Sequence, residues 1–96
     1  MFMTELEERV RAEVGNIFDS ETGQTFEEMH LIQSVRETSL GNITVEFMPT
    51  SPFYPIAFKL AADIREVAKT VLGVERVVVY CRGHAMGEQI NEMTNK

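Results

Sequence analysis

The chain has 96 residues, of which 44% are hydrophobic and 25% charged, and its net charge is −6. This length supports one domain with one core, and the negative charge argues against nucleic acid as a partner because a phosphate backbone would be repelled. No apolar run approaches the length of a membrane span, and residues 1–5 lack the regions of a signal peptide, so we expect no membrane partner and a cytoplasmic location. A single cysteine, Cys81, agrees with a reducing compartment.

A capping box at Thr4 and Glu7 predicts that a first helix begins there, and apolar residues at helical spacing extend it to near Phe18. Turn-forming residues then predict a loop over residues 18–28. Within it, Asp19 is expected either to form an Asx turn or to present its carboxylate, together with Glu21, to a partner or metal.

Apolar and polar residues alternate over residues 29–36 and again over 42–48, which predicts two strands. The turn formers at 39–42 between them predict an antiparallel hairpin. Pro49 removes a ladder donor, so the second strand should end there. His30 is expected on the surface of the first strand.

Prolines at 49, 52 and 55 stiffen the next loop, and Pro55 suits the first turn of a helix. An apolar stripe predicts a long helix from Pro55 that Gly73 ends as a C′ residue. Residues 76–81 are apolar on both faces, which predicts a strand with a neighbour on each edge. Residues 85–93 predict a short amphipathic helix.

These elements predict an α+β fold: helix, β-hairpin, long helix and strand in a small mixed sheet covered by helices on one face, plus a short C-terminal helix. We expect one domain over residues 1–96, with its core at about 4–82 and a tail at 83–96. A right-handed crossover makes the second and third strands parallel. Residues 19–28, 50–55 and 81–84 should therefore converge at one end of the sheet, where ligand sites of open sheets form.

Three segments, Asp19–Gly23, Thr50–Pro55 and Gly73–Val77, resemble in order and spacing the motifs of the SufT/PaaD-type domain family, also called domain of unknown function 59. The resemblance spans residues 6–81. It implies an α+β fold and a non-enzymatic accessory role in iron–sulfur cluster assembly or metalloprotein maturation. The implied partners are iron–sulfur assembly proteins or client apoproteins.

The chain departs from the family pattern at three positions within these motifs, and Cys81–His84 replaces the family's usual aromatic and proline-rich ending after the last strand. Ser20 stands where the first motif has proline, Phe53 where the second has glycine, and Tyr54 where the second has its reactive cysteine. Because a phenol has a pKa of about 10 and is a poor soft-metal ligand, thiolate chemistry at this loop is excluded. The residues expected to bind a partner are Asp19, Glu21, Thr50, Ser51, Phe53 and Tyr54.

Alternatives remain for the aromatic pair and for the tail. Phe53 and Tyr54 either anchor a partner or cover the sheet edge internally. The tail could form a structural homodimer, because the apolar face of so short a helix must be buried on the same domain or on a second copy. That face comprises Met86, Ile90 and Met93.

Cys81 and His84 form a C-x-x-H pair that could reach one metal ion, although two ligands do not make a site. A third ligand would come from Asp19, Glu21, His30 or Glu88. We expect no cofactor. The alternative is a metal- or small-ligand-binding protein that uses the corner at residues 50–55, with iron or zinc bound. In the other interpretation, Cys81 is a small buried hydrophobe and His84 a surface turn residue. The chain lacks the motifs of phosphate loops, zinc proteases and serine hydrolases, so we expect no enzyme.

Overall fold

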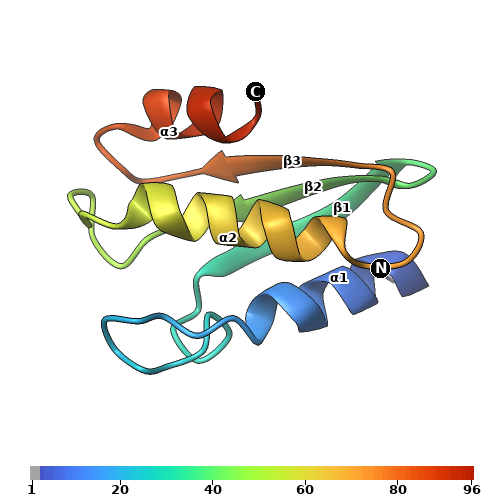
Figure 1. Ribbon diagram of the computed structural model, residues 1–96, viewed down its shortest axis with the longest axis horizontal. Coiled ribbons are helices and arrows are strands. Elements are labelled where there is room, and N and C mark those ends of the chain that lie inside the picture. The colour runs from blue at the N-terminus through green and yellow to red at the C-terminus, as the bar shows by residue number, and fades with distance from the viewer. Residues whose placement is uncertain (1–2) are drawn as a thin grey trace.

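The computed structural model describes residues 3–96, which form three helices and a three-stranded mixed sheet (Figure 1). The elements in chain order are α1 (Glu5–Gly15), β1 (Ile32–Ser39), β2 (Asn42–Phe47), α2 (Ala57–Lys69), β3 (Arg76–Cys81) and α3 (Gly87–Thr94). The strand order is β1-β2-β3, with β1 antiparallel and β3 parallel to β2. The predicted α+β class, the hairpin and the parallel pair are therefore confirmed. Residues 1 and 2, part of the segment expected to lack a signal peptide, lie outside the described residues.

One face of the sheet forms the core. In β2, Ile43, Val45 and Phe47 are buried while the alternate residues are only half-buried, as the period of a strand requires. Figure 1 shows α1 and α2 lying along the sheet, and both helices contribute buried residues to the same cluster. Each large apolar side chain removed from water here contributes about 1.5–3 kcal/mol. No helix among residues 3–96 has the length and apolar character to cross a membrane.

The first helix begins where the sequence predicts. The Thr4 hydroxyl accepts the N–H of Glu7 at 3.0 Å and the Glu7 carboxylate accepts the N–H of Thr4 at 2.7 Å, which is the predicted capping box. The helix ends at Gly15, however, and not near Phe18. The chain leaves the helix early because Phe18 forms a β-bridge with Thr25.

The first strand begins three residues later than predicted. Met29 lies in a turn, its N–H bonded to the carbonyl of Thr25, and His30 follows with a φ of 55°. His30 is therefore exposed in a turn and not on a strand. A register shift between Ile32 and Ser34 then interrupts the alternation. Leu31 and Val35 are buried as predicted, but Ile32, predicted on the other face, is buried too.

The long helix also has different ends. It begins at Ala57, because Pro55 lies in a turn whose N–H···O bond runs from Ala57 to Tyr54. It ends at Lys69, capped at Thr70, and so Gly73 is not the C′ residue. Gly73 instead takes a φ of 101° in the loop to β3, a conformation that favours glycine.

The third strand lies at an edge of the sheet, which corrects the prediction of a strand neighbour on each side. Asn91 of α3 and Asn95, which caps the C-terminus of that helix, take the place of the missing strand. Asn95 accepts the N–H of Val79 at 2.9 Å and donates to its carbonyl at 2.8 Å, and Asn91 accepts the N–H of Cys81 at 2.7 Å. The helix thus closes a sheet edge that would otherwise expose backbone groups.

The apolar residues of the tail do not share one buried face. Ile90 is fully buried, whereas Met86 and Met93 are 46% and 64% exposed. The tail therefore docks through Ile90 and its asparagines. The predicted helix itself is confirmed, over Gly87–Thr94.

Replacing Asn95 by Ala should lower the free energy of unfolding by about 1–3 kcal/mol, because both polar groups of Val79 lose their partners. Gln89→Ala, an exposed change in the same helix, is the matched control and should cost less than about 0.5 kcal/mol. Urea unfolding measures both values. Equal losses in the two variants would contradict the edge-capping role.

Candidate functional site

Three loops meet at one end of the sheet, as the topology predicts; we call this the three-loop end and define it as residues 16–31, 48–56 and 82–86. The Tyr54 hydroxyl donates to Asp19 Oδ2 at 2.9 Å, which joins the first loop to the second. The N–H of Ala85 donates to the carbonyl of Pro52 at 2.8 Å, which joins the second loop to the third. The predicted convergence is confirmed.

Asp19 is buried at this junction, with 1% of its surface exposed. Its carboxylate accepts the N–H of Glu21 at 3.2 Å, the hydroxyl of Thr22 at 3.1 Å and the Tyr54 phenol. Burial works to raise the pKa of Asp19, but the hydrogen bonds from Glu21, Tyr54 and Thr22 together hold it below its ordinary value. The Asx-turn interpretation is confirmed: the carboxylate is ionised, satisfied and turned inward.

Tyr54 is half-buried over the core, and its phenol is a donor to Asp19. Burial, followed by the hydrogen bond to Asp19 and the charges of Asp19 and Glu21, raises the pKa of Tyr54 to about 12. The phenol therefore stays protonated at neutral pH. Tyr54 thus provides a neutral hydrogen-bond donor, whereas a thiolate would be a nucleophile and a soft-metal ligand.

The rest of the 50–55 loop faces outward. Phe53 is 77% exposed, and its N–H donates to the Ser51 hydroxyl at 3.0 Å, which stiffens the turn. Thr50 and Glu21 are exposed and Ser51 is half-buried. Each interpretation of the aromatic pair thus fits one of its residues. Phe53 is presented to solvent, as a partner anchor would be, while Tyr54 covers the core.

Cys81 and His84 have different surroundings. Cys81 is 6% exposed, and burial raises the pKa of its thiol to about 11. The His84 Nδ1 accepts the N–H of Met86 at 3.0 Å, so Nε2 carries the hydrogen and donates to the carbonyl of Tyr54 at 2.9 Å. His84 thereby clamps the third loop to the second.

No group of three or more His, Cys, Asp and Glu side chains within residues 3–96 could hold a metal ion. The proposed third ligands Asp19, Glu21, His30 and Glu88 are thus not gathered around the Cys81 and His84 pair in the described part of the chain. The C-x-x-H spacing alone could not reveal the role of His84, because its partner, the Tyr54 carbonyl, belongs to a distant loop.

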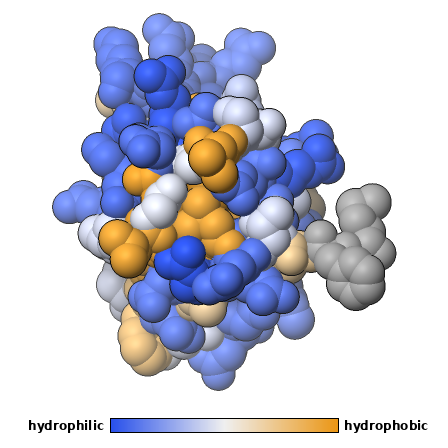
Figure 2. All heavy atoms as spheres, turned by 90° about the vertical axis from the view of Figure 1, so that its right-hand side faces the viewer, coloured by the Kyte–Doolittle hydropathy of each residue, from blue (hydrophilic) through white to orange (hydrophobic). Residues whose placement is uncertain are grey.

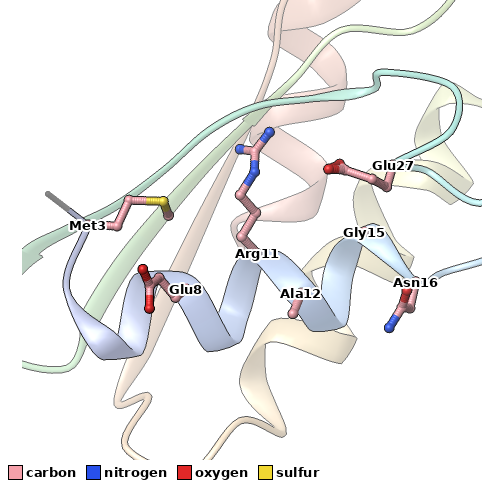
Figure 3. Close-up of a pocket in the computed structure, with 7 residues that line it drawn as sticks. All are labelled: Met3, Glu8, Arg11, Ala12, Gly15, Asn16 and Glu27. Carbon is pink, nitrogen blue, oxygen red and sulfur yellow. The ribbon is translucent and has the colours of Figure 1, made fainter. Parts of the chain in front are cut away.

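A separate hollow of about 290 Å³ lies along α1 (Figure 3). Its lining comprises Met3, Glu8, Arg11, Ala12, Gly15, Asn16 and Glu27. Arg11 already donates to the carbonyl of Ile32 at 3.3 Å, and Glu27 packs against Gly15. The hollow is lined mainly by α1. Asn16 and Glu27 belong to the first loop of the three-loop end, but none of residues 48–56 or 82–86 lines the hollow, so we assign it no part in the candidate site.

The fold is that of a small α+β domain with three loops gathered at one end of its sheet. A family model described as iron-sulfur cluster assembly protein matches residues 7–79, and the chain belongs to this family. An uncharacterized protein of Methanocaldococcus jannaschii, MJ1129, is 32% identical over 77 residues, which cover 80% of this chain and 81% of that protein. A domain of unknown function, DUF59, from Bacillus anthracis has the same fold, with a TM-score of 0.73 and 21% identity over 93% of this chain and 87% of that one.

Replacing Tyr54 by Phe should lower the free energy of unfolding at neutral pH by about 1–3 kcal/mol, because buried Asp19 loses a donor. Tyr80→Phe, at the chain's other tyrosine, is the matched control and should be nearly neutral. The folded-state pKa of Tyr54 is raised from 10.0 to about 12. The stabilisation of the fold by its phenol is therefore complete below pH 10.0, and it is lost as the pH rises through about 12.

The difference in unfolding free energy between the wild type and Tyr54→Phe should therefore narrow as the pH rises through this window. Other titrating groups are common to both proteins and cancel in the difference. Denaturant unfolding at a series of alkaline pH values measures it. A difference that stayed constant would show that the phenol does not stabilise the fold through its proton.

Alkylation of Cys81 by iodoacetamide at neutral pH should be slow in the folded protein, because the thiol is buried and its pKa is raised. The same protein in urea is the control and should label rapidly. Mass spectrometry follows both reactions. Equal alkylation rates in the folded and the urea-unfolded protein would mean that the thiol is accessible, and would favour a redox or metal-binding role for Cys81.

Proposed function

We propose that the protein is a non-enzymatic accessory factor in iron–sulfur cluster assembly or metalloprotein maturation, and that it acts by protein–protein contact through residues 50–55. Family membership supports a role in iron–sulfur cluster assembly, since the matching family model covers residues 7–79. The partners in this proposal are iron–sulfur assembly proteins or client apoproteins. We place this role in the cytoplasm, because a single cysteine suits a reducing compartment.

The observation that carries the proposal is the presentation of Phe53. This ring is 77% exposed, yet the loop that bears it is held on both sides, by the Tyr54 bond to Asp19 and by the Ala85 bond to Pro52. An aromatic side chain on a preorganised loop loses little conformational entropy on binding and is a common interface anchor. Exposed Glu21 and Thr50 would supply the polar rim.

The donor set argues against a cluster held by this chain alone. Iron–sulfur clusters are held by several cysteine thiolates, and this chain has one cysteine. That thiol is buried with a raised pKa, and the position matching the family cysteine bears the hydrogen-bonded phenol of Tyr54. The residues present do not fit a resident cluster, so the proposed contribution is contact with proteins that hold the cluster or receive it.

The polar side chains in the interior of the three-loop end have structural partners, which favours contact over turnover. Asp19 receives three hydrogen-bond donors, the Tyr54 phenol is one of them, and both ring nitrogens of His84 are occupied. A general base must reach a substrate proton directly or through one water. In this arrangement the ionisable groups hold the loop in place.

Phe53→Ala should abolish the recovery of iron–sulfur assembly proteins or client apoproteins in an affinity pull-down from the native host, with an expected loss of about 2 kcal/mol of binding. The melting temperature should stay unchanged, since the ring is mostly outside the core. Mass spectrometry of the captured proteins measures their recovery, and calorimetry measures the melting temperature.

Met93→Ala is the matched control, because Met93 is 64% exposed and lies on α3. It should leave both capture and melting unchanged. A Phe53→Ala variant that captured the same proteins as the wild type would remove this loop from the binding surface. If the wild type captured no iron–sulfur protein, the proposed role in iron–sulfur cluster assembly or metalloprotein maturation would be contradicted.

A further inference from the structure

A second exposed apolar surface lies at the opposite end of the molecule, where the β1–β2 turn meets the α2–β3 loop. Leu40 is 94% exposed and Leu72 is 86% exposed, more than any other large apolar residue between 3 and 96. Figure 2 faces this end and shows apolar surface gathered in its middle, with hydrophilic surface around it. We call Leu40, Leu72 and half-buried Val74 the hairpin-end patch.

The two leucines are carried on turns that touch each other. The N–H of Glu75 donates to the carbonyl of Gly41 at 2.7 Å, and a methyl group at Gly41 would lie 3.1 Å from the carbonyl oxygen of Gly73. A methyl group at Gly73 would lie 3.4 Å from the side chain of Leu6, so the core lies next to the turn that carries Leu72. The two exposed leucines therefore stand on turns whose backbones are in contact with each other.

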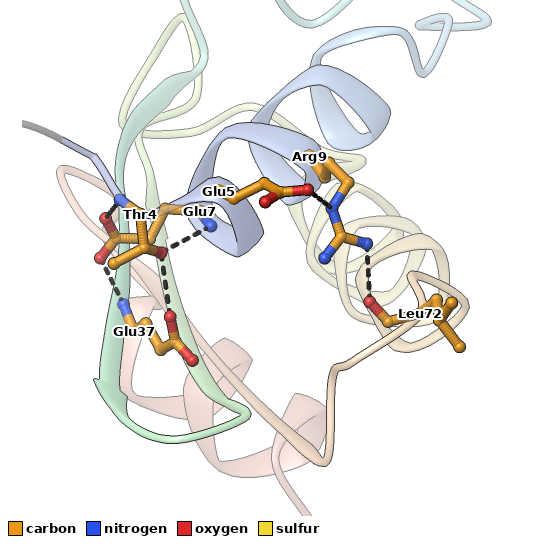
Figure 4. A network of polar contacts seen from close by, with 6 residues as sticks. All are labelled: Thr4, Glu5, Glu7, Arg9, Glu37 and Leu72. Atoms are coloured by element: carbon orange, nitrogen blue, oxygen red, sulfur yellow. Dashed lines mark hydrogen bonds and ion pairs between the residues drawn. The ribbon is translucent and has the colours of Figure 1, made fainter.

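Hydrogen bonds from α1 hold this end in place (Figure 4). Arg9 Nη1 donates to the carbonyl of Leu72 at 2.7 Å, and the Thr4 hydroxyl donates to Glu37 at 2.9 Å. Glu37 in turn accepts the N–H of Gly41 at 3.0 Å. Both leucines thus project from a fixed base, which reduces the entropy that binding would cost.

Acidic residues slightly outnumber basic residues around the patch. The acidic residues at this end are Glu5, Glu7, Glu37 and Glu75, and the basic residues are Arg9, Arg36 and Arg76. The Arg9 guanidinium lies 3.9 Å from Glu5 and is already bonded to the Leu72 carbonyl. An apolar surface with an acidic rim is complementary to an apolar surface with a basic rim.

We propose that the hairpin-end patch is a second docking surface, and that its occupant is a basic amphipathic segment of another protein. The segment would place apolar side chains against Leu40 and Leu72 and its Lys or Arg side chains against the acidic rim. A second copy of this chain fits less well, because a twofold contact through the patch would bring each acidic rim against itself. The surface lies away from residues 50–55, so this proposal does not depend on the role of Phe53.

The test uses isotopically labelled full-length protein and a synthetic amphipathic peptide of leucine and lysine at helical spacing. Amide shifts should concentrate at residues 37–42 and 70–76. Leu40→Ser with Leu72→Ser should weaken binding by about tenfold or more, and added salt should weaken it further. Glu75→Gln should weaken binding and reduce its dependence on salt.

Two controls separate this surface from others. A peptide with glutamate in place of lysine should not bind, and Met93→Ser and Phe53→Ser should each bind the lysine peptide like the wild type. Shifts confined to residues 50–55, or equal binding of both peptides, would overturn the proposal. A dimer in sedimentation that becomes a monomer in the Leu40→Ser, Leu72→Ser variant would overturn it in favour of a second copy.

Discussion

The hydrogen bond from Tyr54 to Asp19 connects parts of the chain that are far apart in sequence. It places the loop after α1 against the loop before α2, and His84 then binds the carbonyl of the same tyrosine from the loop after β3. The bond is charge-assisted and largely removed from water, so its loss would leave a buried carboxylate with fewer donors. Through this junction, Phe53 projects from a fixed position.

The small sheet depends on helix side chains at both of its outer edges. On β1, Glu7 accepts the N–H of Glu37 at 2.6 Å and Arg11 donates to the carbonyl of Ile32. These bonds to the N–H groups of Glu37 and Thr4 lower the pKa of Glu7, despite some opposing desolvation, and so favour its ionised form. On β3, the asparagines of α3 serve the corresponding groups. Because three strands leave two edges, this arrangement limits pairing with other chains along the sheet.

The chemistry of the three-loop end and the shape of the opposite end support one view of the molecule. The phenol of Tyr54 is part of the internal hydrogen bonding of the three-loop end, since it donates to Asp19. The three most exposed large apolar side chains among residues 3–96 stand on turns, Phe53 at one end and Leu40 with Leu72 at the other. In our proposals, such a molecule contacts different proteins at its two ends.

Local patterns in the sequence determined the elements whose stability is local. The Thr4 capping box, the hairpin turn and the end of β2 before Pro49 were predicted correctly, because residues within a few positions satisfy the backbone there. The convergence of the three loops also followed from the sequence, since chain connectivity and crossover handedness restrict the topology.

Only the tertiary structure decided the features that depend on distant partners. The start of β1 moved because residues 25–30 form turns and a register shift follows Ile32. The roles of Asn95 and His84 were not predicted, because their partners, the backbone groups of Val79 and Tyr54, come from other elements. The division between Phe53 and Tyr54 has the same origin: adjacent residues on one loop differ in exposure because only Tyr54 reaches the carboxylate of Asp19, which the fold brings to it from across the sheet.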